Sequence, residues 1–401
     1  MTYFGEFRSN WRTMAAAVVG MGTGYILYLY LQSLFAPHLL REFGWSKSQF
    51  ALITSTTLIS LITLPIYGRL TDRYGAKRIG AIGVLSYPLI FLAFAFFDGS
   101  FAQFYLLNLA LMALVAGTTS SALYSRIIAH RFGRARGLAL SLVASIPPAV
   151  AAMAAPLLSA LIEDRGWRAG YLALAALVTV TGAFVLLMMP NDAPAQRAGP
   201  VSDGVQAERD IRAILARPAF RIIMSGIFLV CISALALPAQ LKLILIDRQA
   251  GAAQAAMMVA LFSAGIAVGR LGCGAALDRF PPQIVAAISL GLPSLGLFIL
   301  ASGATQPSLL AGAVILIGLA MGAELDIATY LVMRWFRPEI YSSVYGLIGA
   351  GTTLSGVGGS LLLSLTLKLS GGFDLYLAMC AVAMAAGAAC FLLLGRHPMV
   401  N

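Results

Sequence analysis

The chain has 401 residues, of which 60% are hydrophobic and only 11% are charged, and its formal net charge is +11. About a quarter of the residues of soluble domains are charged, so this composition excludes a polar surface of ordinary extent. Apolar runs long enough to cross a bilayer, roughly twenty residues, recur along the whole chain. They predict an all-α membrane protein whose twelve transmembrane helices lie, in chain order, at residues 13–38, 49–69, 79–97, 102–127, 137–161, 169–189, 219–246, 254–276, 283–302, 308–333, 343–368 and 373–395.

The basic residues are distributed unevenly around these spans. If the N-terminus is cytoplasmic, nineteen of the 27 Lys and Arg residues fall at cytoplasmic span ends, seven fall at the opposite ends, and Arg270 lies inside a span. This asymmetry is the positive-inside bias of membrane proteins, and it predicts that both termini are cytoplasmic. The net charge therefore indicates membrane topology rather than a nucleic-acid partner. In a bacterial protein the membrane would be the inner (plasma) membrane.

One long polar segment, residues 191–218, separates six spans from six. The sequence thus predicts a six-helix half over 1–190, a cytoplasmic central loop over 191–218 and a second six-helix half over 219–401. The halves share a motif, because GRLTDRYGAKR at 68–78 follows span two and GAALDRF at 274–280 follows span eight. Internal repeats of this kind are typical of secondary transporters.

The motif at 68–78 resembles the cytoplasmic loop signature of the major facilitator superfamily. In that family the acid and the basic residues of the loop are thought to latch neighbouring helices in one of the alternating states. A carboxylate beside several arginines can form and release charge-assisted hydrogen bonds as two halves move. The resemblance implies a conformational latch made of Asp72, Arg73, Gly75 and Arg78, with Asp278 and Arg279 in the second copy.

Two shorter motifs, FGWSKSQ at 43–49 and RGWRAGY at 165–171, resemble the monocarboxylate transporter and oxalate–formate antiporter branch of that superfamily. The superfamily implies the major facilitator fold, in which spans one, four, seven and ten line the cavity. On span one, Tyr28 and Gln32 share a face at helical spacing and are predicted substrate contacts. The alternative for this aromatic face is helix packing.

Three charged residues lie deep within the predicted spans: Arg270 in span eight, and Glu324 and Asp326 in span ten. At 1.5 Å per residue, Arg270 and Asp326 lie about 12 Å from a cytoplasmic helix end, and Glu324 lies about 15 Å from it. Charges at this depth are costly and are by default functional. Arg270 is therefore the predicted partner of the acids. Its setting, GRLGCG, also resembles that of the span-eight arginine that contacts the substrate carboxylate in the monocarboxylate and oxalate branch.

The two acids are predicted to differ, because two residues along a helix turn through about 200°. Asp326 and Tyr330 share a face that looks like a cavity lining, and both are predicted substrate-binding residues. Asp326 is also the predicted counter-ion of Arg270, released when a substrate anion arrives. Glu324 faces drier residues, where desolvation favours the neutral carboxyl, and it is the predicted proton-coupling acid, with Asp326 as a second candidate. Either acid could instead form a fixed bond to a neighbouring helix.

Together these features predict a secondary transporter that moves a small organic anion, first of all a monocarboxylate, with a proton, by alternating access and as a monomer. The alternatives left open are an anion/anion exchanger, an exporter of drugs or amphiphiles, and a nutrient receptor of the same fold. An enzyme is not indicated, because the histidines His38, His130 and His397 are scattered and no catalytic constellation is evident. No cofactor or metal is expected, and the four cysteines have neither metal-ligand spacing nor a disulfide pattern, so they are predicted to be packing residues.

Overall fold

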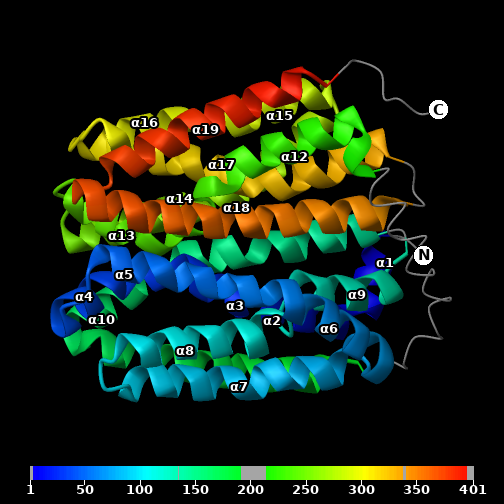
Figure 1. Ribbon diagram of the computed structural model, residues 1–401. Coiled ribbons are helices and arrows are strands. Elements are labelled where there is room, and N and C mark those ends of the chain that lie inside the picture. Colours follow the sequence, from blue (N-terminus) through cyan, green and yellow to red (C-terminus); the bar gives the residue numbers. More distant parts are fainter. Residues whose placement is uncertain (1–2, 134, 191–213, 337–339, 395–401) are drawn as a thin grey trace. The chain divides into compact units, whose positions relative to one another are not determined.

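The computed structural model describes residues 3–133, 135–190, 214–336 and 340–394 (Figure 1). Helices joined by short turns make up these ranges, and no strand occurs within them. In chain order the α-helices are α1 (Tyr3–Ser9), α2 (Trp11–Gly22), α3 (Tyr25–Leu31), α4 (Ala36–Phe43), α5 (Lys47–Leu52), α6 (Ser60–Tyr74), α7 (Ala76–Phe96), α8 (Phe101–Leu111), α9 (Ser121–Arg131), α10 (Arg136–Met188), α12 (Pro218–Val230), α13 (Ala236–Asp247), α14 (Ala252–Leu277), α15 (Pro282–Gly291), α16 (Ser294–Ala301), α17 (Pro307–Trp335), α18 (Tyr341–Ser370) and α19 (Asp374–Leu392).

Eleven stretches of the described residues are long and apolar enough to cross a membrane. One of them, Leu138–Met188, counts as two crossings, because its 51 residues are interrupted at Gly166, where φ is +83°. A residue with a side chain would be strained at that angle, so the glycine ends one crossing and begins the next. The prediction of twelve transmembrane helices is confirmed, and the observed spans begin and end within a few residues of the predicted ones. The cytoplasmic location of both termini stays a prediction.

The chain divides into two compact units, and each is described here by itself. The first comprises Met1–Ser46 and Thr56–Arg197, and the second comprises Lys47–Ser55 and Ala198–Asn401. The start of the second span, α5, therefore groups with the second half of the sequence, where it packs against α13 and α18. The division into 1–190, 191–218 and 219–401 stays a prediction, and its central loop lies outside the described residues as far as position 213.

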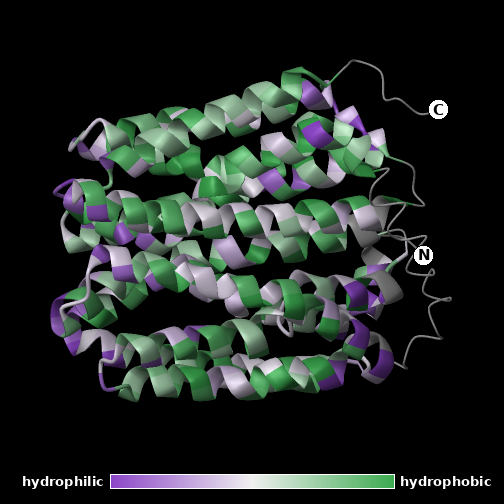
Figure 2. Cartoon of the chain, in the orientation of Figure 1, coloured by the Kyte–Doolittle hydropathy of each residue, from purple (hydrophilic) through white to green (hydrophobic). Residues whose placement is uncertain are grey.

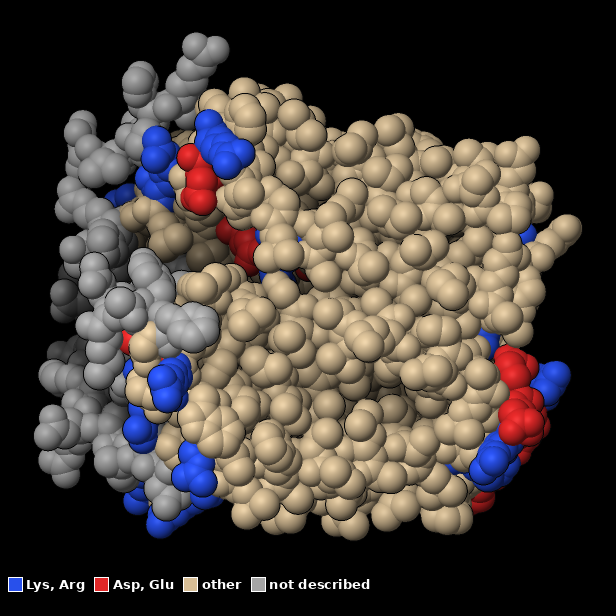
Figure 3. All heavy atoms as spheres, turned by 180° about the vertical axis from the view of Figure 1, so that it is seen from behind, with Lys and Arg blue, Asp and Glu red and all other residues tan. Residues whose placement is uncertain are grey.

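The surface of the helices is largely apolar. Hydrophobic residues fill the middle of the helices and polar residues gather toward their ends (Figure 2). On the face drawn in Figure 3, charged side chains are likewise concentrated at helix ends. Large apolar side chains such as Leu89, Phe96 and Leu187 are 66%, 75% and 76% exposed. Such a surface would aggregate in water, whereas in a bilayer it faces lipid.

In the second unit, small residues bring α14 and α17 into close contact. A Cβ atom added at Gly269 would collide with the backbone of Leu319, and one added at Gly322 would collide with the backbone of Ile266. Membrane helices commonly associate in this way, because packing of small residues replaces the hydrophobic driving force that lipid removes. The glycines thus hold Arg270, which follows Gly269, beside the part of α17 that carries Glu324 and Asp326.

Candidate functional site

Arg270 and Asp326 form an ion pair in the second unit, with 3.4 Å between Arg270 Nε and Asp326 Oδ2. The Arg270 side chain is 18% exposed and the Asp326 side chain is 40% exposed. Helix α14 ends at Leu277 and α17 at Trp335, so the pair lies about 10–14 Å from these helix ends. Tyr330 follows one turn after Asp326 and is partly exposed. An ion pair at this depth is costly to separate unless another group replaces the missing partner.

Glu324 makes a different contact from Asp326. Its Oε2 atom accepts a hydrogen bond from the thiol of Cys231, with 3.5 Å between Oε2 and Sγ. The positive charge of Arg270 acts on both acids. We call Arg270, Asp326, Glu324 and Cys231 the core cluster. Glu324 therefore contacts a neighbouring span. A fixed bond of this kind is the alternative to proton coupling that the sequence left open for either acid.

Cys231 was not among the residues predicted for the site. Its thiol is a free one, as are those of Cys273, Cys380 and Cys390. Within an apolar span, no spacing or pattern distinguishes it from a packing residue. Its partner lies 93 positions further along the chain, so only the fold brings the two together.

The predicted substrate contacts of span one belong to the first unit. Tyr28 is 3% exposed, and its ring centroid lies 5.3 Å from that of Phe91 and 6.1 Å from that of Phe94. Its hydroxyl oxygen lies 3.4 Å from that of Tyr171. These surroundings are those of a packing residue. Gln32 begins the 3₁₀ segment η1 (Gln32–Leu34) and is partly exposed. The part of both residues in substrate binding stays a prediction.

The residues of the predicted latch lie around the ends of α6 and α14. The side chain of Asp72 lies outside the described part of the structure. Gly75 separates α6 from α7 with φ at +86°, an angle that favours glycine. The side chains of Arg73, Arg78, Asp278 and Arg279 are exposed, and none of these four forms an ion pair within the part of the chain that the structure describes. The latch stays a prediction.

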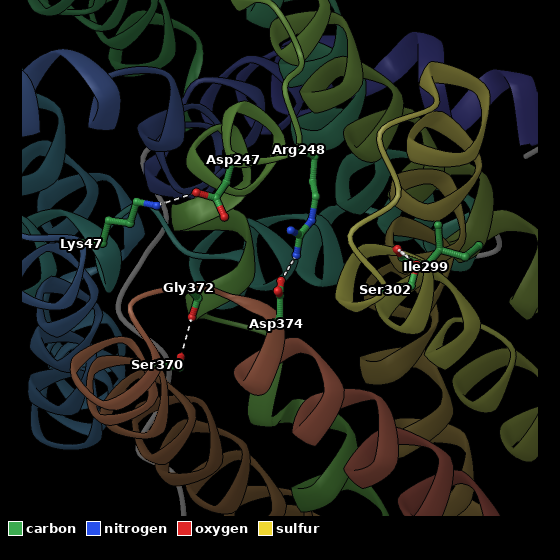
Figure 4. A network of polar contacts seen from close by, with 8 residues as sticks. All are labelled: Lys47, Asp247, Arg248, Ile299, Ser302, Ser370, Gly372 and Asp374. Carbon is green, nitrogen blue, oxygen red and sulfur yellow. Dashed lines mark hydrogen bonds and ion pairs between the residues drawn. The ribbon is translucent and has the colours of Figure 1, made fainter.

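A second group of charges lies where α13 ends and where α5 and α19 begin (Figure 4). Lys47 Nζ is 2.7 Å from Asp247 Oδ1, and it lies 4.9 Å from the ring centre of Phe373. Arg248 pairs with Asp374. The side chains of Lys47 and Asp247 are 33% and 30% exposed, whereas that of Arg248 is 8% exposed. We call Lys47, Asp247, Arg248 and Asp374 the span-end cluster.

In the first unit, the two short motifs of the sequence lie in direct contact. Glu42, just before FGWSKSQ, accepts a hydrogen bond from Trp167 Nε1 at 2.6 Å and pairs with Arg168 Nη1 at 2.7 Å. Both partners belong to RGWRAGY. The Trp167 hydrogen bond, followed by Arg168, stabilises the charged carboxylate and holds the pKa of Glu42 below its ordinary value. The residue just before the first motif thus makes two polar contacts with the second motif.

The profile of the Major Facilitator Superfamily matches residues 13–249 and 223–400. The chain belongs to the Major Facilitator Superfamily. The resemblance predicted from residues 68–78 is therefore confirmed. This facilitator is a transporter rather than an enzyme and a multi-pass integral membrane protein, for which the inner membrane is the usual location in bacteria.

Comparison with individual proteins supports the branch as well. The facilitator is 29% identical to monocarboxylate transporter 11 of Homo sapiens over 364 residues, which make up 87% of this chain and 72% of that protein. It is 31% identical to monocarboxylate transporter 4 of Rattus norvegicus over 176 residues, which make up 43% of this chain and 37% of that protein. The facilitator thus resembles the monocarboxylate branch, as predicted from residues 43–49 and 165–171.

Solved structures agree with the fold. The nucleoside transporter NupG is 16% identical, with a TM-score of 0.78, and the match covers 95% of this chain and 99% of that one. A D-xylose–proton symporter is 14% identical, with a TM-score of 0.71, and the match covers 97% of each chain. At these identities the likeness extends to the fold alone.

Proposed function

We propose that this facilitator carries a small monocarboxylate together with a proton by alternating access, and that Arg270 binds the carboxylate. The observation that carries the proposal is the ion pair of Arg270 with Asp326 well inside two membrane-crossing helices. The names of the similar monocarboxylate transporters support the substrate class.

Arginine suits this task, because its planar guanidinium bonds both oxygens of a carboxylate and stays charged at any physiological pH. Within the pair the acid is the more exposed member, at 40% against 18%. An arriving carboxylate can therefore take the place of Asp326 without first uncovering Arg270. Since the substrate replaces one carboxylate by another, Arg270 keeps a counter-ion at every stage of the exchange.

A proton would balance the charge of the arriving anion. Before loading, Asp326 balances the charge of Arg270, and Glu324 is the ionised acid that can take a proton. If an anion and a proton enter together, the proton neutralises Glu324 while the substrate anion pairs with Arg270, so loading leaves the net charge of the site unchanged. Loading without added charge avoids a further cost of holding charge in a low-dielectric interior during the conformational change.

Uptake into liposomes by the purified protein tests the proposal. Labelled lactate, pyruvate, oxalate and an aromatic acid are each supplied with and without an inward proton gradient. We expect the gradient to raise uptake of a monocarboxylate, and Glu324→Gln to lose that response. Asp164→Asn, which neutralises an exposed acid of the first unit, is the control and should respond as wild type does.

The alternatives give different results in the same assay. Uptake that needs an opposing anion but ignores the proton gradient indicates an exchanger. Saturable binding without uptake indicates a receptor. An absence of both binding and uptake for every acid indicates an exporter of amphiphiles. Any of these three outcomes contradicts proton–monocarboxylate symport.

A further inference from the structure

Span seven is broken near its middle, at the level of the core cluster. Helix α12 ends at Val230, the 3₁₀ turn η4 covers Cys231–Ser233, and α13 begins at Ala236. A break of this kind frees backbone carbonyl groups, which inside a membrane must find donors within the protein. The break therefore needs support from the helices around it.

Two neighbouring helices of the same unit supply these donors. Ser355 of α18 donates its hydroxyl to the carbonyl oxygen of Phe228, and Tyr376 of α19 donates to that of Ile232 at 3.5 Å. A Cβ atom added at Gly359 of α18 would collide with the Ile232 carbonyl, so this glycine lets α18 lie directly against the break. The break is thus a supported element of the fold, and the residues of its turn are held in place from one side.

Cys231, the first residue of this turn, faces the proposed proton site. It is 2% exposed, and its thiol donates to Glu324 Oε2 of α17. A thiol is a weak donor, and a hydrogen bond to a charged acceptor is stronger than one to a neutral acceptor. The bond between Cys231 and Glu324 is therefore strong when Glu324 is ionised and weak when Glu324 is protonated.

We propose that Cys231 is a positioning residue that joins Glu324 to the break in span seven through its hydrogen bond. When Glu324 takes up a proton, this hydrogen bond weakens and the backbone of the break becomes free to move. The inference rests on the proposed role of Glu324 as the proton-coupling acid. Beyond that role, it identifies span seven as the segment that responds to protonation and Cys231 as the side chain that links Glu324 to this segment. A pre-existing break whose neighbours change partners is the kind of bistable element that can convert a local charge change into a movement.

Other titratable groups lie on the helices around Glu324. The helices packed against α17 are α12, α14, α15, α16 and α18. Their described titratable side chains are Arg221 near the start of α12, Arg270 and Cys273 on α14, and Tyr345 and Lys368 toward the two ends of α18. Arg270 acts on Glu324 through its charge, and Cys273 interacts with Asp326. Cys231 is the described side chain that joins Glu324 to the break.

Hydrogen–deuterium exchange of the full-length protein in lipid nanodiscs tests the release of the break without any substrate. At each pH, the exchange of the amides around residues 231–236 is compared between wild type and variants, so that the intrinsic pH dependence of exchange cancels. We expect Cys231→Ala to exchange about five-fold faster than wild type at high pH, the effect of losing one modest hydrogen bond. At low pH the difference should disappear, because protonated Glu324 has already released the thiol.

Three further variants separate this role from simple packing. Cys231→Ser restores a donor and should return the exchange to within about two-fold of wild type. Glu324→Gln should exchange quickly at every pH. Cys390→Ala removes a thiol elsewhere in the same unit and should leave the break as in wild type. Exchange in Cys231→Ala that equals wild type at all pH values would overturn the proposal, as would an increase that is the same at high and low pH.

The infrared S–H stretch of Cys231, isolated as the difference between wild type and Cys231→Ser, gives a second measurement of the bond itself. We expect its frequency to change with pH in wild type and to be constant in Glu324→Gln. A constant frequency in both would remove the proposed tie even if Cys231→Ala unfolds. Because neither measurement uses a transported anion, both can succeed where carboxylate uptake fails, and the two proposals are distinguishable.

Discussion

The core cluster and the span-end cluster contain the same kinds of charged group in opposite surroundings. In the core, Arg270 and Asp326 are 3.4 Å apart within membrane-crossing helices. At the span ends, Lys47 and Asp247 are 2.7 Å apart, and both are about one-third exposed. The shorter pair lies at span ends, where water and salt reach it, whereas the longer pair lies midway along two membrane-crossing helices, with Asp326 40% and Arg270 18% exposed. Distance alone therefore does not rank the two pairs.

The surroundings assign them different consequences. An exposed ion pair contributes little to stability, because solvation compensates each charge when the pair opens. A buried pair is also weak evidence for stability, but removing one member leaves an uncompensated charge and is strongly unfavourable. Substitution in the core cluster should therefore change both ligand binding and stability, whereas substitution in the span-end cluster should mainly cause modest changes in stability.

The largest effect is expected at Arg270. Arg270→Gln should lower the uptake of a transported carboxylate by on the order of 100-fold, because a truncated buried charge pair loses several kcal/mol. Arg270→Lys should lose about ten-fold, since lysine keeps the charge without the planar fork. The measurement is initial uptake normalised to the amount of reconstituted protein.

Arg334→Gln is the matched control for this substitution, because Arg334 is an exposed arginine near the end of α17. It should transport as wild type does. Normal transport by Arg270→Gln would end the role proposed for the core cluster.

Asp326→Asn should produce a different kinetic pattern. Without its counter-ion, Arg270 should bind a substrate carboxylate more tightly and release it more slowly, since the replacement partner is gone. We expect KM and kcat to fall together, each by about ten-fold, as happens when ground-state binding is strengthened. The kinetics of uptake over a range of substrate concentrations separate the two constants. A raised KM with unchanged kcat would instead make Asp326 a direct substrate contact.

Within the span-end cluster, Asp374 should matter more than Asp247. Asp374→Asn leaves Arg248 without its ion-pair partner, and the Arg248 side chain is only 8% exposed. We expect a loss of about 2 kcal/mol in the free energy of unfolding, less than the roughly 3–5 kcal/mol for breaking a fully buried pair, because Asp374 itself is largely exposed. Unfolding in mild detergent measures the change. A loss equal to that of Asp247→Asn would show that the burial of Arg248 has no energetic consequence.

The Lys47–Asp247 pair tests the exposed limit of the comparison. A double-mutant cycle with Lys47→Ala and Asp247→Asn should give a coupling energy of about 0.5 kcal/mol. In 1 M salt, where the Debye length is about 3 Å, the coupling should disappear. A coupling energy that persists at high salt would mean that salt does not screen this pair, which is the behaviour expected of the core cluster.

The sequence predicted the fold and the charged part of the core cluster for identifiable physical reasons. Span length is set by bilayer thickness, so the twelve crossings could be read from apolar runs. Arg270, Glu324 and Asp326 stood out because charge is rare inside a span. The sequence did not reveal which side chains contact one another. Cys231 looks like any small apolar residue, and Lys47 and Asp247 are 200 positions apart. The buried surroundings of Tyr28 were also hidden, because a helical aromatic stripe looks the same facing a cavity or a neighbouring helix.

Glu42 extends the comparison to the first unit and gives the smallest expected effect. Its neighbours hold the pKa of Glu42 below its ordinary value of 4.5. The ionised carboxylate therefore stabilises the folded protein at pH values above 4.5, and this contribution is lost as the pH falls through the lower folded-state pKa. The side chain is 41% exposed, so water screens the interaction, and we expect it to contribute less than about 0.5 kcal/mol. Glu42→Gln should thus be slightly less stable than wild type near neutral pH, and this difference should shrink at acidic pH, as thermal unfolding at several pH values would measure. Because glutamine still accepts the Trp167 hydrogen bond, the variant keeps that bond, and the part of the difference that titrates belongs to the charge of Glu42. A difference independent of pH would mean that the contact of Glu42 with Trp167 and Arg168 owes nothing to the charge of Glu42.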